Sequence, residues 1–188
     1  MGKRYPKHVN IIASEDPSKP DGVDFHLEKP DGTRLASIVF DKGGEGMSHD
    51  DEHEVHFSLV QESGMTLEFA QSKKDVLWVA WGDKDHEPPC PETQPANCPD
   101  PVFYAEKSAP KKLTVVNTNP KKSFFSFTIN FVDPHSQTPT KLIPFDPIGE
   151  NKNGGIGASE SSFALASSTV ALLVGVAVVL AIGYVLLT

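Results

Sequence analysis

The chain has 188 residues and a formal net charge of −8. The acidic balance disfavours nucleic-acid binding, because phosphate backbones would be repelled, and it gives no electrostatic attraction to anionic lipid head groups. Sixteen prolines and 14 glycines indicate many turns and few long helices.

The N-terminal segment, MGKRYPKHVNII, carries basic residues but only a short apolar run. A secretory signal needs a longer apolar core followed by a small-residue cleavage site. The Met-Gly start would suit myristoylation, but Pro6 stands where that motif has a hydroxyl residue. We therefore expect neither an export signal nor an N-terminal lipid.

Alternating apolar and polar residues dominate the chain from position 23 onward. Val23, Phe25 and Leu27 alternate with polar residues, and the tetrapeptide KPDG brackets them at 19–22 and 29–32 as two turns. Further predicted strands are RLASIVF, EVHFSLV, GMTLEFA, DVLWVAW, VFYA, LTVV and SFFSFTINF.

These segments predict an all-β fold, an antiparallel β-sandwich of the immunoglobulin-like class over residues 1–149. No convincing helical period precedes Phe163. The Cys…Trp…Cys core of antibody domains is missing, so the expected likeness is architectural. One face of the last strand is predicted to lie in the core: Phe125, Phe127, Ile129 and Phe131.

A histidine-rich stretch, MSHDDEHEVH, is the candidate metal site. On a helix, His49, His53 and His56 would share one face and suit Zn²⁺, Ni²⁺ or Cu²⁺. The strand pattern that begins at EVHFSLV instead favours a solvated acidic hairpin, with His56 on its polar side. Both interpretations stay open.

Cys90 and Cys98 flank a proline-rich segment in EPPCPETQPANCPDP. Their spacing is neither a CxxC redox motif nor a close zinc-ligand pair, and in a reducing cytosol we expect free thiols. The loop is too long and proline-rich for a plain hairpin. We expect either a partner-contact loop or an irregular crossover.

Residues 113–155 resemble the C-terminal half of the DP-EP family of small bacterial β-sandwich proteins. Leu113-Thr114 with Asn117 and Asn119, and then Asp146-Pro147 with Asn151, carry the resemblance. Gly149 and Glu150 depart from the family's usual apolar run. The resemblance implies a bacterial β-sandwich; the family has no assigned chemistry.

Residues 150–162, rich in Gly, Ser and Asn, predict a flexible linker. Residues 163–188, FALASSTVALLVGVAVVLAIGYVLLT, contain no charge. As a helix, this segment would reach roughly 37 Å, enough for about 30 Å of hydrocarbon. It predicts a single C-terminal transmembrane helix. With no export signal, the sandwich is expected on the cytoplasmic side, as in a tail-anchored protein.

Ala171, Gly175 and Gly183 would fall on one face of that helix. Small residues at such spacing permit close helix packing in membranes, although Gly and Ala are also common in spans generally. The face could therefore meet either lipid or another transmembrane protein.

The chain lacks GxSxG, Walker A, HExxH and a GxGxxG that follows a strand, so no enzyme, small-molecule substrate or cofactor is predicted. We expect a membrane-anchored binding or structural protein, an accessory subunit of a larger respiratory or photosynthetic membrane complex. The alternative is a membrane-tethered metal-binding or cupredoxin-like domain that uses the three histidines.

Overall fold

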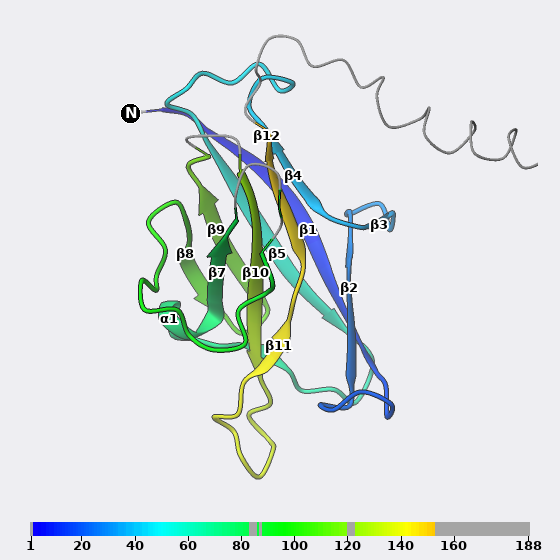
Figure 1. The fold of residues 1–188 in the computed structure, drawn as a ribbon. Helices are drawn as coiled ribbons and strands as arrows, with labels where there is room; N and C mark the ends of the chain where they lie inside the picture. The colour runs from blue at the N-terminus through cyan, green and yellow to red at the C-terminus, as the bar shows by residue number, and fades with distance from the viewer. Residues whose placement is uncertain (1, 83–85, 87, 120–122, 153–188) are drawn as a thin grey trace, which may run out of the picture. The chain divides into compact units, whose positions relative to one another are not determined.

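The structure is a computed structural model that describes residues 2–82, 86, 88–119 and 123–152. These residues form two β-sheets and one short helix (Figure 1), so the all-β, two-sheet prediction is confirmed. The elements are β1 (Arg4–Glu15), β2 (Val23–Glu28), β3 (Arg34–Leu35), β4 (Ile38–Asp41), β5 (Glu52–Gln61), β6 (Glu68–Phe69), α1 (Lys73–Val76), β7 (Leu77–Trp81), β8 (Phe103–Ala109), β9 (Lys112–Asn117), β10 (Ser123–Val132), β11 (Ile143–Phe145) and β12 (Ile148–Lys152).

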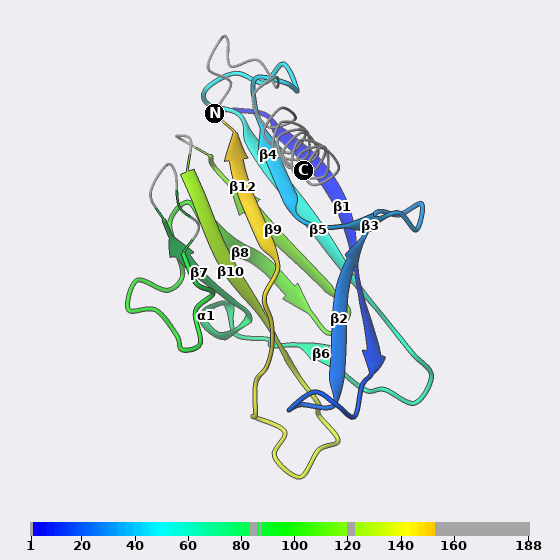
Figure 2. The same ribbon diagram turned by 45° about the vertical axis from the view of Figure 1, so that its right-hand side comes forward.

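The first sheet has the strand order β3-β2-β1-β5-β9-β8 (Figure 2). Its two longest strands, β1 and β5, are neighbours and run parallel, from the pair Arg4–Glu52 to the pair Ala13–Gln61. The prediction of a purely antiparallel sandwich is therefore wrong at this pair. Alternation in the sequence reveals which face of a strand is buried, but not the direction of its neighbour. The chain between β1 and β5 provides the long connection that a parallel pair needs.

The second sheet is built around β10. β6 and β7 pair with one edge of β10. β11 and β12 pair with its other edge, and β4 follows β12 in the sheet. β12 and β4 form the second parallel pair, which runs from Gly149–Ile38 to Lys152–Asp41. α1 separates β6 from β7, and the Oγ of its N-cap residue Ser72 accepts a hydrogen bond from the Lys74 amide.

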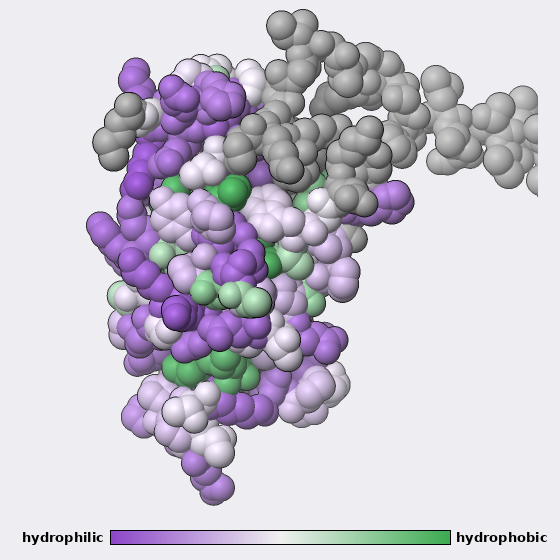
Figure 3. Space-filling view, turned by 60° about the vertical axis from the view of Figure 1, so that its left-hand side comes forward, coloured by the Kyte–Doolittle hydropathy of each residue, from purple (hydrophilic) through white to green (hydrophobic). Residues whose placement is uncertain are grey.

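The space between the sheets is filled largely by phenylalanine. The predicted core face of β10 is fully buried, since Phe125, Phe127, Ile129 and Phe131 have no exposed area. The Phe103 ring of β8 lies 5.0 Å, centroid to centroid, from both the Phe125 and the Phe127 ring. The described surface seen in Figure 3 is mainly hydrophilic, with small hydrophobic areas.

Gly149 of β12 lies directly opposite Phe125 of β10. A methyl group at position 149 would lie 2.5 Å from Phe125 Cζ, far inside contact distance. The glycine that departs from the apolar run of the DP-EP pattern is therefore needed here to make room for an aromatic ring.

β12 ends at Lys152, so the last described strand occupies the first three residues of the range 150–162 that was expected as linker. Residues 163–188, with Ala171, Gly175 and Gly183, lie outside the described residues. Within the described part of the chain, no helix is long and apolar enough to cross a membrane.

Candidate functional site

The three histidines of the predicted metal site are separated by the strand geometry of β5. His53 and His56 are three residues apart on a strand, so they point to opposite faces: His53 is fully buried, and the His56 side chain is 33% exposed. His49 lies in the preceding loop, with 85% of its side chain exposed. Among the described residues, no group of three or more His, Cys, Asp and Glu side chains could hold a metal ion.

Buried polar side chains instead gather at one end of the sandwich. Asn117 ends β9 in the first sheet, and Asn151 belongs to β12 in the second. Asn117 Nδ2 donates a 2.8 Å hydrogen bond to Asn151 Oδ1, and both residues are fully buried. Asn117 Oδ1 in turn accepts a hydrogen bond from the Asn119 amide at 2.8 Å. The two sheets are thus joined by a side-chain hydrogen bond as well as by apolar packing.

Asn119 extends this junction to β4. Its backbone φ is +39°, in the left-handed region where Asn is tolerated better than most residues. This conformation places Nδ2 3.2 Å from the carbonyl oxygen of Phe40, to which it donates. One short asparagine-rich segment therefore contacts both β12 and β4, the two strands of the second sheet that run parallel.

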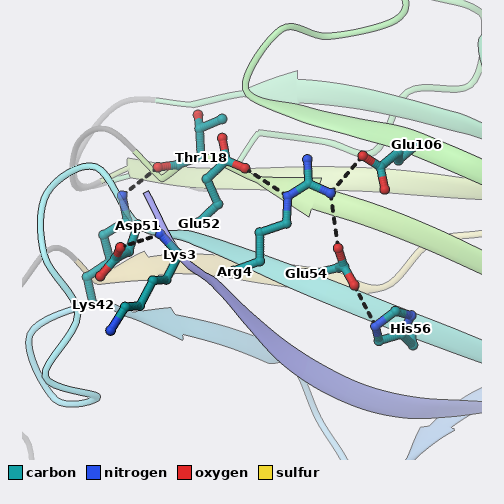
Figure 4. A network of polar contacts seen from close by, with 9 residues as sticks. All are labelled: Lys3, Arg4, Lys42, Asp51, Glu52, Glu54, His56, Glu106 and Thr118. Carbon is teal, nitrogen blue, oxygen red and sulfur yellow. Dashed lines mark hydrogen bonds and ion pairs between the residues drawn. The ribbon is translucent and has the colours of Figure 1, made fainter. Parts of the chain in front are cut away.

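Lys42 follows β4 and is only 6% exposed. Its ammonium group donates to the carbonyl oxygen of His49 at 2.8 Å. It also donates to the carbonyl oxygen of Thr118 at 2.7 Å (Figure 4). Burial lowers the pKa of Lys42, while the nearby Asp51 carboxylate opposes that shift. Lys42 therefore holds the loop between β4 and β5 against the end of β9.

Asp51 fixes the other end of the same loop. Its carboxylate accepts the amides of Lys3, at 2.7 Å, and Ser48, at 2.8 Å, and these hydrogen bonds lower the pKa of Asp51. Figure 4 shows the contact with Lys3, just before β1 begins. The loop is thus attached to the first sheet as well as to Thr118.

His53 lies beneath this loop. Its ring packs edge-on against Phe40, with 5.3 Å between the ring centroids, and neither ring nitrogen has a hydrogen-bond partner in the described structure. The nearest carboxylate is that of Glu45, 3.6 Å from Nδ1, and Glu45 also contacts Lys7 at 2.5 Å. Burial lowers the pKa of His53 to about 4. The imidazole is therefore neutral at pH 7 and takes up a proton only in acid.

An ion-pair network covers the outer face of the first sheet at the same end (Figure 4). Arg4 contacts Glu106 at 2.7 Å, Glu54 at 3.1 Å and Glu52 at 3.2 Å, and these contacts raise its pKa. Glu54 also lies 2.8 Å from His56 Nε2. His56 belongs to this surface network, where its ring also stacks on that of His8 with 5.0 Å between the ring centroids, and it is separated from the buried His53.

The loop that contains Cys90 and Cys98 packs on its own domain. The two cysteines are not joined in a disulfide. Cys98 Sγ lies 3.0 Å from the Lys74 carbonyl oxygen, and burial raises the pKa of the thiol. Two residues after Cys98, Asp100 accepts a 2.7 Å hydrogen bond from Trp81 Nε1. These contacts are those of an irregular crossover; a partner-contact role for the loop stays a prediction.

A scan against protein-family models and a search of curated proteins found no match. The DP-EP resemblance therefore stays a prediction, although its residues Asn117, Asn119 and Asn151 converge at one junction. Sequence reasoning missed Lys42 and Asp51, because a lysine and an aspartate in a Gly- and Asp-rich loop are typical of a solvated surface.

Proposed function

We propose that this chain is a membrane-anchored, non-enzymatic binding protein. Its C-terminal apolar segment, residues 163–188, would hold an immunoglobulin-like sandwich at the membrane, on the cytoplasmic side. There the domain would serve as an accessory subunit of a larger membrane complex. The observation that carries the proposal is how β12, the strand that leads towards this segment, is held in the domain.

β12 has a neighbour on each side, β10 and β4. It is also joined to the opposite sheet, because Asn151 accepts the hydrogen bond from Asn117. A strand held in three ways resists being pulled out of a domain better than an edge strand with one neighbour. This placement suits a domain that is attached to a membrane through its C-terminal end.

The loop between β4 and β5 supports the same role. Lys42 and Asp51 fix this loop at the end where β12 finishes, since Lys152 pairs with Asp41. A rigid end beside the connection to the anchor would let the remaining faces of the sandwich meet a partner in a defined way. Binding through strands and loops is common among immunoglobulin-like sandwiches, although the parallel pairs β1–β5 and β12–β4 depart from that class.

Purification through a tag on Met1 in mild detergent tests the subunit role. We expect a stoichiometric membrane-protein partner, which is lost when the small-residue face is blocked by Gly175→Leu and Gly183→Leu. A matched variant, Val174→Leu with Val185→Leu, adds bulk elsewhere on the segment and should keep the partner. Purification of the unaltered chain as a monomer without a partner would end the subunit proposal.

A further inference from the structure

A groove follows the side of the sandwich between β2 of the first sheet and β11 of the second. It consists of two hollows of about 330 and 340 Å³. The hollows adjoin, because Asp21, Val23 and Ile143 line both of them.

The floor of this groove is apolar. Phe25 stacks on Phe131, with 4.9 Å between ring centroids, and lies 5.3 Å from the Phe145 ring. Phe25 therefore connects the floor to the core, because Phe131 is fully buried there. The apolar lining of the two hollows consists of Val23, Phe25, Met65, Leu67, Ile143 and Phe145, with Pro17, Pro20 and Pro144.

The rim of the groove is acidic. Two lysines reach it: Lys19 lies 3.6 Å from Asp24, and Lys141 lies 2.6 Å from Asp21. Five carboxylates against these two ammonium groups leave the rim with a charge of −3. The carboxylates belong to Glu15, Asp21, Asp24, Asp133 and Asp146.

β2 also offers a strand edge to this groove. β3 pairs only with Leu27 and Glu28, so β1 is the only described strand that pairs with Val23–His26. β11 offers a poorer edge, since Pro144 has no N–H to donate. An unpaired strand edge beside an apolar groove is where extended peptides add to a sheet.

We propose that this groove binds an extended, cationic segment of a partner protein, which adds as a strand to the Val23–His26 edge of β2. Its apolar side chains would cover the floor, and its lysine or arginine side chains would meet the rim carboxylates. The inference rests on the binding role proposed above and names the chemistry of its partner.

The test uses the full-length chain in mild detergent and a fluorescently labelled peptide of alternating lysine and valine. Fluorescence polarisation should show saturable binding of one peptide per chain. The same peptide with alternate residues N-methylated, so that it lacks half of its N–H donors, should bind at least about tenfold more weakly, because strand addition depends on main-chain hydrogen bonds. A peptide of alternating glutamate and valine should not bind.

The rim is tested by Asp21→Asn with Asp24→Asn, which should weaken binding about tenfold. The matched control, Asp50→Asn with Glu92→Gln, removes the same charge from exposed positions outside the groove and should change binding less than about twofold. If the double rim variant does not fold, Glu15→Gln alone should weaken binding about threefold.

Equal weakening by the rim and control variants would show a general charge effect and would overturn the proposal, as would a lack of saturable binding. Either failure would leave membrane anchoring unaffected, because anchoring is measured separately on the tail.

Discussion

Asn117 Nδ2 donates a 2.8 Å hydrogen bond to Asn151 Oδ1, and this bond joins β9 of one sheet to β12 of the other. Both side chains are fully buried. A buried donor that loses its acceptor is costly, because neither water nor another group replaces it. The hydrogen bond adds a contact with the opposite sheet to the backbone pairing of β12 with β10 and β4.

Replacing Asn151 by alanine should lower the free energy of unfolding by about 2 kcal/mol, because Asn117 Nδ2 loses its acceptor in the interior. Urea denaturation measures the change. Asn10→Ala, on the outer face of β1, should stay within about 0.5 kcal/mol of the unaltered chain. The double variant Asn117→Ala with Asn151→Ala should cost at least about 0.5 kcal/mol less than the sum of the single variants. Strict additivity would contradict a direct interaction.

His53 should make the domain less stable in acid. Its folded-state pKa, about 4, lies below its ordinary value of 6.5, so the unfolded chain binds more protons between these pH values. Stability from this residue is complete above about pH 6.5 and is lost as the pH falls towards about 4, by roughly 3 kcal/mol in total.

Unfolding free energies measured between pH 7.5 and pH 4 check this prediction. His53→Leu should remove most of the dependence while leaving stability at pH 7.5 nearly unchanged, because the ring nitrogens lack hydrogen-bond partners in the described structure. His49→Ala, which changes an exposed histidine, should keep the dependence. If the unfolding free energy of His53→Leu depended on pH as strongly as that of the unaltered chain, His53 would not be the source of the acid sensitivity.

Lys42→Met should destabilise the domain by about 2–3 kcal/mol. The methionine keeps most of the apolar stem but withdraws a charged donor from the carbonyl oxygens of His49 and Thr118. Lys73→Met, at an exposed lysine, serves as the control and should be nearly neutral. Similar stability losses in both variants would show that the buried contacts of Lys42 have no special role.

Gly149→Ala should cost about 1–3 kcal/mol, because the added methyl group meets the Phe125 ring at 2.5 Å. Phe125→Leu alone should also destabilise, through lost packing with Phe103 and Trp81. Thermal unfolding of the two single variants and of the double variant checks the contact. The double variant should be more stable than the sum of the two losses predicts, and simple additivity would mean that the clash is relieved elsewhere.

Residue patterns could predict the strands and the buried face of β10, because period-two alternation follows directly from the geometry of a half-buried strand. The same patterns could not predict that β1 and β5 run parallel, since strand direction depends on long-range pairing. They also could not place His53, because its separation from His56 follows from where β5 begins: a strand that starts at Glu52 puts the two rings on opposite faces.

The hydrogen-bonded asparagines that join the two sheets could be predicted from the sequence only in part. Asn117, Asn119 and Asn151 stood out through the DP-EP resemblance, but their convergence depends on β9 and β12 meeting across the two sheets. Lys42 gave no signal at all. Whether a lysine in a loop is buried depends on carbonyl groups far away in the chain, such as that of Thr118. The residues next to Lys42 in the sequence do not indicate such a contact.

Alkaline carbonate extraction of membranes from cells that express the full-length chain tests the central proposal, anchoring by residues 163–188, most directly. The unaltered chain should stay in the membrane pellet. Val176→Lys with Val179→Lys should move it to the supernatant, because each lysine near the middle of a span costs about 2.5–3.5 kcal/mol. Ser159→Lys with Ser161→Lys, which adds the same charge before the segment, should leave it in the pellet. Release of the unaltered chain by carbonate would contradict the proposal.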